Sequence, residues 1–298
     1  MTKKSLPKGS IVALVTPFDE YGRVDAKKIK QLVKWHVAKG TKGIVAFGTT
    51  GESCTLTNTE KQKILDTVLT EANGRLFVFA GSGSTDTFKA VKDTRRFGLM
   101  GADALLVVTP YYLKTNQDGM LKHYLAVAES SVKPIVLYNV PSRTGCEIFA
   151  DVVSVLKQHK NVVGIKEASK NLDYLNKIAQ LVDQDFLLYC GNDDALLPYL
   201  SMGASGVISV WANAMPQVVA KLIDEWFSGN FSQALRIQLK YQDLIDLLFV
   251  EPNPIPIKAL LNQMGWQVGK PRLPLGEISQ KTSILLKNQL LRLKETKQ

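Results

Sequence analysis

The sequence has few of the residues on which metal binding and disulfide bonding depend. Its 298 residues include only three cysteines and three histidines, scattered along the chain at Cys54, Cys146, Cys190, His36, His123 and His159. No pair of them has the spacing of a metal site, so we expect no bound metal. An odd number of separated cysteines fits reduced thiols in a cytosolic protein better than a disulfide framework.

Long apolar segments are also missing. The basic start of the chain, residues 1–5, leads into no apolar run of the signal-peptide type. No stretch reaches the roughly 18 uncharged apolar residues that a membrane-spanning helix needs. We therefore expect a cytoplasmic protein with no membrane partner.

Positive charge is in excess, and a net charge of +10 would suit a nucleic-acid-binding protein. The basic residues, however, alternate with apolar ones, as they do over 27–39 and 287–297. This pattern is typical of the solvated face of a helix, and no aromatic residues are interleaved with the charges as in single-strand binders. We expect no nucleic-acid partner and, at most, mild steering of small anionic substrates.

What the sequence does contain is a repeated alternation of short β-branched runs and longer amphipathic stretches. We predict strands at Ile11–Val15, Gly43–Phe47, Leu76–Ala80, Ala104–Val108, Pro134–Tyr138, Val162–Lys166, Phe186–Cys190 and Gly206–Val210. Such alternation indicates βα units around a parallel sheet, and eight units are the number that closes a barrel. We therefore predict an α/β fold, a (β/α)8 TIM barrel over residues 1–229. An open doubly wound sheet is the alternative that strand counting leaves open.

The pattern changes after Gly229. Helical stretches are expected at Phe231–Phe249, Ile257–Gly265 and Glu277–Lys294, with no strand between them. Glu251–Pro256 is a proline-rich segment through which a helix cannot continue. We predict a C-terminal helical extension over residues 230–298, which would buttress the barrel or form oligomer contacts.

In such a barrel, chemistry is expected where the strands end, because the βα loops converge at that edge. The predicted strand ends carry hydroxyl and amide groups and one lysine, but no histidine and no ring of carboxylates for a divalent metal. Lys166 ends an apolar strand, and desolvation there would favour the uncharged amine that attacks a carbonyl. A strand-end lysine that simply reaches into water is the alternative.

Other strand ends carry groups that would assist such a lysine. Tyr138 lies one strand away and could carry the protons that imine formation requires. Thr49 and Tyr112 could extend a relay of hydroxyl groups. The amides and hydroxyls of Gly48–Gly51 would suit a carboxylate, and Arg143 could bind a second one, although a surface position would make that arginine unremarkable.

Other catalytic motifs are incomplete. Gly81–Asp86 follows a predicted strand but lacks the third glycine of a dinucleotide-binding motif. Gly51–Thr55 lacks the final glycine of a nucleophile elbow, and the sequence contains no P-loop. Neither nucleotide binding nor serine-hydrolase chemistry is therefore predicted.

Taken together, three motifs resemble the dihydrodipicolinate synthase branch of the pyruvate-dependent class I aldolase family, to which N-acetylneuraminate lyase also belongs. They are Gly48–Ser53, Tyr138–Gly145 and Gly164–Ala168, and the likeness runs from about Gly9 to the last helix, including Phe249–Pro256. The resemblance implies a TIM-barrel lyase that condenses pyruvate with L-aspartate 4-semialdehyde to 4-hydroxy-tetrahydrodipicolinate. This is the first committed step of diaminopimelate and lysine biosynthesis. It also implies a homotetramer built from tight dimers, and no cofactor beyond the covalent pyruvate imine.

The resemblance also assigns roles to single residues. Lys166 becomes the imine-forming lysine and Tyr138 the proton donor and acceptor. The relay positions fall on Thr49 and Tyr112, and Tyr111 matches an aromatic residue that interdigitates with the neighbouring subunit. The substrate-binding positions fall on Thr50, Gly191 and the backbone of Ile208, with Arg143 facing the carboxylate of the semialdehyde.

One departure from the family concerns feedback by lysine. Members that lysine inhibits often carry His, Asn and Glu at positions that fall here on Asn58, Thr85 and Lys89. An acidic residue would attract the ammonium of the effector, whereas Lys89 would repel it. We therefore predict weak or absent inhibition by lysine.

Two alternatives to the synthase remain at this point. N-acetylneuraminate lyase and keto-deoxy-sugar-acid aldolases share the lysine and the tyrosine, but a sugar site would be expected to differ from Ser142–Gly145, where Arg143 suits a short carboxylated aldehyde. A catalytically inactive barrel that serves as a cationic binding protein is the more remote alternative. The joint presence of lysine, tyrosines and threonines speaks against it.

Overall fold

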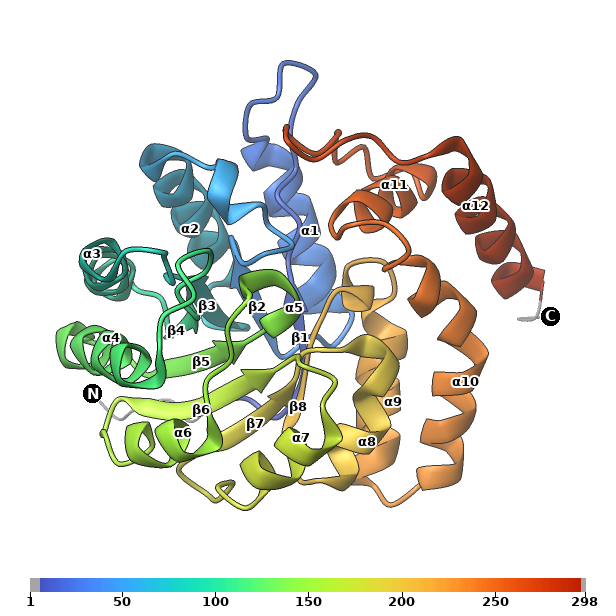
Figure 1. Ribbon diagram of the computed structural model, residues 1–298. Helices are drawn as coiled ribbons and strands as arrows, with labels where there is room; N and C mark the ends of the chain where they lie inside the picture. Colours follow the sequence, from blue (N-terminus) through green and yellow to red (C-terminus); the bar gives the residue numbers. More distant parts are fainter. Residues whose placement is uncertain (1–5, 296–298) are drawn as a thin grey trace.

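The computed structural model describes residues 6–295, in which parallel strands form a closed barrel surrounded by helices (Figure 1). The strands are β1 (Gly9–Ala13), β2 (Gly43–Ala46), β3 (Phe77–Gly81), β4 (Ala104–Val108), β5 (Ile135–Asn139), β6 (Val162–Glu167), β7 (Leu187–Cys190) and β8 (Gly206–Ser209). Each strand pairs with the next, and β8 closes the barrel on β1, with Ile208 opposite Ile11. The predicted (β/α)8 TIM barrel is confirmed, and the open doubly wound sheet is excluded because β1 and β8 are paired.

The first strand differs most from its predicted bounds. It spans Gly9–Ala13, two residues earlier than the predicted Ile11–Val15. Leu14 and Val15 are buried, but their amides donate to the Val45 carbonyl at 3.1 Å and to Asn213 Oδ1 at 3.0 Å, where the chain leaves β1. An apolar run in the sequence therefore identifies buried residues but does not show at which residue the strand ends.

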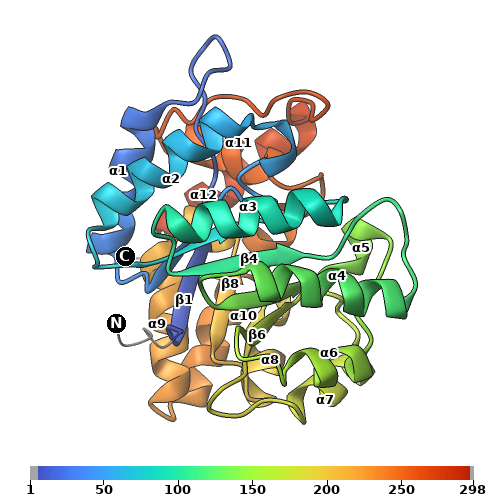
Figure 2. The same ribbon diagram turned by 90° about the vertical axis from the view of Figure 1, so that its left-hand side faces the viewer.

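Helices cover the outside of the barrel, and Figure 2 looks onto the side that α1 to α4 cover. The barrel helices are α1 (Ala26–Ala38), α2 (Asn58–Ala72), α3 (Thr87–Leu99), α4 (Gln117–Ser130), α5 (Pro141–Thr144), α6 (Ala150–Leu156), α7 (Leu172–Ala179), α8 (Leu196–Ser201) and α9 (Pro216–Phe227). Short 3-10 turns lie at η1 (Ser53–Thr55), η2 (Asp193–Ala195) and η3 (Trp211–Asn213).

The helices form where the sequence supplies caps and one apolar face. α2 begins with a capping box in which Thr57 Oγ1 accepts from the Glu60 amide at 3.2 Å and Glu60 Oε2 accepts from the Thr57 amide at 2.9 Å. α1 buries Ile29, Leu32 and Val33 while its lysines at 27, 30 and 34 are exposed, as the alternating pattern predicts.

Alternation along the strands creates two apolar layers. Inward-facing side chains fill the barrel, among them Ile11, Val45, Phe79, Leu106, Val136, Tyr189 and Ile208. Outward-facing ones, such as Ile165 on β6, pack under the helices. Because neighbouring residues face opposite sides, Lys166 points into the barrel while Glu167 points out of it. There Glu167 accepts hydrogen bonds from Tyr199 Oη and, at 3.2 Å, from Asn139 Nδ2.

After α9 the chain forms three helices, α10 (Phe231–Leu247), α11 (Ile255–Gln263) and α12 (Gln280–Glu295), which lie along one side of the barrel in orange and red in Figure 1. α10 packs on α9, and α12 packs on α10 and α11. Whether this part is a separate unit that starts at residue 230 stays a prediction. Residues 1–5 and 296–298 of the two predicted domains lie outside the described part of the chain.

Two predicted helix starts in this extension are wrong. α11 begins at Ile255, so Pro256 lies inside its first turn, where proline needs no amide partner. α12 begins at Gln280 rather than Glu277, because Ser279 Oγ accepts from the Thr282 amide at 3.2 Å and so caps the helix. No helix in residues 6–295 is long and apolar enough to cross a membrane.

Candidate active site

Lys166 and Tyr138 meet at the end of the barrel where β5 and β6 end. The two residues are directly paired across these strands, and each is only 6% exposed. Lys166 Nζ lies 4.2 Å from the centre of the Tyr138 ring. The strand-end lysine is therefore buried against the phenol instead of reaching into water.

Gly191 makes room for this lysine at the end of β7. A Cβ atom at position 191 would lie 3.1 Å from Lys166 Cε and 2.7 Å from Ala168 Cβ. It would also lie 2.8 Å from the Glu167 carbonyl oxygen, which accepts from the Gly191 amide at 2.7 Å. A larger residue at position 191 would push the Lys166 side chain aside.

A buried carboxyl group near Lys166 was not among the predicted site residues. Asp193 is 1% exposed, and its Oδ2 accepts from the amides of Val210 and Trp211, each at 2.9 Å. Burial raises the pKa of Asp193, while those amides and the charge of Lys166 oppose the rise. The residue follows the strand next to Lys166, and that position could have identified it from the sequence.

The loop after β2 holds the two predicted threonines in different environments. Thr49 lines a cavity of about 430 Å³, whereas Thr50 is 2% exposed and its Oγ1 accepts from Asn253 Nδ2 at 2.9 Å. The Gly51 amide donates to the Gly48 carbonyl at 3.1 Å. That the amides and hydroxyls of Gly48–Gly51 bind a carboxylate stays a prediction. The Gly51 amide is used within the tight turn itself. A Cβ atom at position 51 would lie 2.8 Å from Phe47 Cα, so the turn leaves no room for a side chain there.

Arg143 and Thr50 are connected through Asn253, which was not among the predicted site residues. Arg143 lies on α5 and is exposed, and its Nη2 donates to the Asn253 carbonyl at 3.2 Å. Asn253 is 5% exposed, and its Oδ1 is buried without a hydrogen-bond partner within the described chain. It belongs to the Phe249–Pro256 motif, so the C-terminal extension contributes to the site.

The cavity brings together only some of the predicted residues. Thr49, Tyr111, Tyr138 and Arg143 line it, as does Asn253. The remaining substrate-binding candidates and the lysine itself, namely Lys166, Thr50, Gly191 and Ile208, are not part of its wall. Lys166 contacts one of the residues that line it, because its Nζ lies against the Tyr138 ring.

The two tyrosines after β4 point to different places. Tyr111 lines the cavity, and its Oη accepts from Cys54 Sγ at 3.6 Å. Tyr112 is 85% exposed, has a left-handed backbone with φ of 75°, and does not line the cavity of its own chain. A single chain therefore does not bring Tyr112 to Tyr138 and Thr49.

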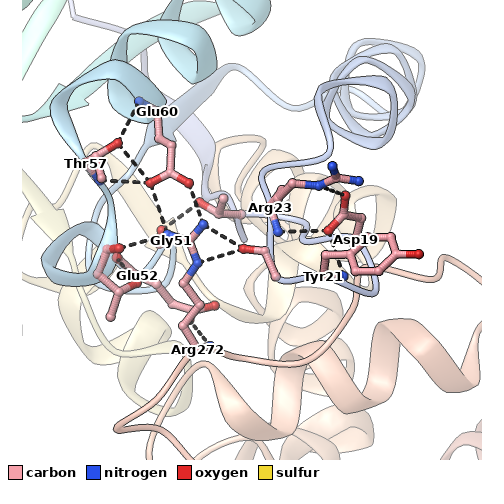
Figure 3. A network of polar contacts seen from close by, with 11 residues as sticks. Asp19, Tyr21, Arg23, Gly51, Glu52, Thr57, Glu60 and Arg272 are labelled. Atoms are coloured by element: carbon pink, nitrogen blue, oxygen red, sulfur yellow. Dashed lines mark hydrogen bonds and ion pairs between the residues drawn. The ribbon is translucent and has the colours of Figure 1, made fainter.

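A polar network attaches the loop after β2 to the C-terminal extension (Figure 3). Lys258 Nζ donates to Glu52 Oε1 at 2.9 Å, and both side chains are almost fully buried. Burial lowers the pKa of Lys258 to about 8, and the charge of Glu52 opposes this. The Arg272 amide donates to Glu52 Oε2 at 2.8 Å, while its guanidinium binds Glu60 and donates to the Gly22 carbonyl at 2.7 Å.

This network explains why the threonine loop has a defined shape. Glu52 has a left-handed backbone with φ of 58°, which its bonds to Lys258 Nζ and to the Arg272 amide compensate. Breaking a buried ion pair of this kind typically costs about 3–5 kcal/mol. The extension therefore helps to place Thr49 and Thr50 at the mouth of the barrel.

Comparison with known proteins agrees with this geometry. The model of the dihydrodipicolinate synthetase family matches residues 6–292. A 4-hydroxy-tetrahydrodipicolinate synthase of Clostridium novyi (strain NT) is 44% identical over 286 residues, which are 96% of each chain. The crystal structure of dihydrodipicolinate synthase from Aquifex aeolicus is 40% identical with a TM-score of 0.94, covering 96% of this chain and 98% of that one.

A structure described as a monomeric dihydrodipicolinate synthase variant is 39% identical with a TM-score of 0.93, covering 96% of both chains. Matches of this length and identity extend over the barrel, the lysine strand and the C-terminal helices alike. The chain belongs to the dihydrodipicolinate synthetase family.

Proposed function

We propose that this protein is a 4-hydroxy-tetrahydrodipicolinate synthase, a lyase of the class I aldolase type that acts in diaminopimelate and lysine biosynthesis. Its substrates are pyruvate and L-aspartate 4-semialdehyde. The observation that carries the proposal is the buried contact between Lys166 Nζ and the Tyr138 ring at 4.2 Å. The names of the relatives support the same activity over that of N-acetylneuraminate lyase, of a keto-deoxy-sugar-acid aldolase or of an inactive cationic binding protein.

In the proposed reaction, pyruvate is held without any cofactor as an imine on Lys166. The uncharged Lys166 amine attacks C2 of pyruvate to form a carbinolamine, and loss of water gives the imine. Tyr138 lies next to the amine, so its phenol is placed to protonate the departing hydroxyl and to accept protons from the nitrogen. Thr50, Gly191 and the backbone of Ile208 are the proposed contacts of pyruvate.

The second substrate reacts with the nucleophilic form of this imine. Loss of a proton from the pyruvate methyl group gives an enamine, whose carbon attacks the aldehyde carbon of the semialdehyde. The semialdehyde amine then attacks C2 and displaces Lys166, closing the ring. Arg143 is the proposed partner of the semialdehyde carboxylate, and its bond to the Asn253 carbonyl holds the guanidinium near the cavity.

The proton relay is proposed to include a second subunit. Thr49 lines the cavity with Tyr138, whereas Tyr112 is 85% exposed on its own chain. We assign Tyr112 to the relay of a neighbouring copy and Tyr111 to the contact between the two chains. The proposed assembly is a homotetramer of tight dimers in the cytoplasm, although a related variant is monomeric.

A comparison of aldehyde substrates tests the assignment. The protein is supplied with pyruvate and L-aspartate 4-semialdehyde in one assay and with N-acetylneuraminate in a second assay that detects released pyruvate. We expect turnover only in the first assay, and Arg143→Lys should weaken it because lysine lacks the planar pair of donors. Turnover of N-acetylneuraminate but not of the semialdehyde would contradict the proposed function.

A further inference from the structure

Asp193 is a buried carboxyl group that the reaction proposed above does not use. It lies in the turn η2 after β7 and is 1% exposed. Its Oδ2 accepts from the amides of Val210 and Trp211, each at 2.9 Å. Its Oδ1 is buried as well, and within residues 6–295 this atom has no hydrogen-bond partner. One carboxyl oxygen is thus enough to hold the end of β8, and the other is left without a donor.

A carboxylate oxygen of this kind is costly unless a positive charge lies near it. A buried polar atom without a partner loses the hydrogen bonds that water would supply, and a nearby cation compensates for that loss. Lys166 supplies such a charge. Burial raises the pKa of Asp193, and the Ser209 hydroxyl, the two amides and the charge of Lys166 all oppose the rise.

The barrel brings Asp193 and Lys166 to neighbouring strand ends. β6, β7 and β8 follow one another around the barrel (Figure 1), and Lys166 on β6 is paired with Tyr189 on β7. Gly191 continues β7 past the lysine, so closely that a Cβ atom there would lie 3.1 Å from Lys166 Cε. Asp193 follows two residues later and is attached to β8 through Val210. Three adjacent strands therefore fix the carboxyl group relative to the lysine.

The proposed imine needs a negative charge in this part of the site. Lys166 attacks pyruvate as the uncharged amine, but the nitrogen of the imine is positive whenever it holds a proton. Lys166 is 6% exposed and lies against the Tyr138 ring, so this charge is buried. A buried positive charge is costly without a counter-charge. Glu167, the next residue along the chain, does not face it, because its carboxylate points out of the barrel and accepts from Tyr199 Oη.

We propose that the Asp193 carboxylate is the counter-charge of the protonated imine on Lys166. The amides of Val210 and Trp211 hold the carboxylate through Oδ2, which leaves Oδ1 available to the positive nitrogen. The inference rests on the proposed function, because the imine is what brings a lasting positive charge to this position. It assigns to Asp193 the stabilisation of an intermediate, and it makes the charge at position 193, rather than its shape, the property that controls how much imine forms.

Imine formation and turnover by variants of the full-length protein test this proposal. Asp193→Asn keeps the shape, and its side-chain oxygen can still accept from both amides, but it carries no charge. After equilibration with pyruvate and a short pulse of borohydride, half-maximal trapping should need a roughly tenfold higher pyruvate concentration, which corresponds to about 1.4 kcal/mol. KM for pyruvate should rise similarly while kcat changes little, because loss of the methyl proton removes the positive charge. Asp185→Asn, at an exposed position just before β7, is the control and should behave like the wild type.

Asp193→Glu separates charge from shape. It keeps the negative charge but disturbs the packing more than asparagine does, so it should form the imine at lower pyruvate concentrations than Asp193→Asn. The proposal is overturned if Asp193→Asn is trapped like the wild type, if Asp193→Glu is trapped no better than Asp193→Asn, or if kcat alone falls. Should Asp193→Asn not fold, Asp193→Glu must still be trapped at nearly the wild-type pyruvate concentration. A wild type that forms no imine would contradict the proposed function instead.

Discussion

Lys166 and Tyr138 occupy directly paired positions on β6 and β5, and the lysine ammonium lies 4.2 Å from the centre of the tyrosine ring. Because both side chains are 6% exposed, the amine sits in a site from which bulk water is largely excluded. The phenol therefore lies beside the amine, where it is placed for proton transfer. The parallel register of two strands thus brings the two proposed catalytic side chains together.

Asn253 connects Thr50 to Arg143: its side-chain amide donates to Thr50 Oγ1, and its backbone carbonyl accepts from Arg143 Nη2. Asn253→Ala removes only the bond to Thr50, a proposed contact of pyruvate, so we expect kcat/KM for pyruvate to fall several-fold, since a hydrogen bond between neutral groups contributes about 0.5–1.5 kcal/mol. Steady-state kinetics with each substrate varied in turn measures this. Asn288→Ala, an exposed asparagine on α12, is the matched control and should behave like the wild type.

The bond between Glu60 and Arg272 should make stability depend on pH in acid. Arg272 is the main cause that lowers the pKa of Glu60 to about 2 from its ordinary 4.5. The stabilisation is complete above pH 4.5 and is lost as the pH falls toward 2. Between pH 6 and pH 3 the unfolding free energy of the wild type should therefore fall by roughly 2 kcal/mol more than that of Glu60→Gln.

Urea unfolding at several pH values measures that difference. Glu129→Gln, at an exposed position on α4, is the control and should follow the wild type at every pH. Parallel pH curves for the wild type and Glu60→Gln would show that the Arg272 bond does not control acid stability.

Tyr112 should act in the site of a neighbouring subunit. Tyr112→Phe and Lys166→Met are each expected to be nearly inactive alone, because one lacks the relay hydroxyl and the other the amine. Co-expressed, they should regain up to about a quarter of wild-type activity, since about half of the dimers are mixed and each mixed dimer holds one complete site. No gain in mixed dimers isolated by two different tags would place Tyr112 outside the relay.

Free lysine should inhibit weakly or not at all. Lys89 pairs with Asp93 at 2.9 Å, and Arg96 donates to Asn58 Oδ1 at 3.3 Å. Of the three positions that differ from lysine-inhibited members, one is therefore a cation and a second is in contact with one. An inhibition titration should show no half-inhibition at submillimolar lysine, whereas Lys89→Glu should lower the concentration needed. Submillimolar half-inhibition of the wild type would contradict this prediction.

The parts of the fold that depend on local pattern were predictable from the sequence, and those that depend on distant contacts were not. The apolar run that leads to Lys166 is local, and it lies within β6 (Val162–Glu167), where the sequence places it. Asn253 meets Arg143 across 110 residues and Thr50 across 203, and no spacing rule connects such positions.

The most direct measurement is reduction of the protein with borohydride in the presence of pyruvate, followed by mass mapping of the peptides. The account predicts one added pyruvate-derived group per chain, located on Lys166 and absent from Lys166→Met. Tyr138→Phe should form the same adduct more slowly, because the amine remains but its proton donor is lost. An adduct on another lysine, or none at all in active protein, would contradict imine formation at Lys166.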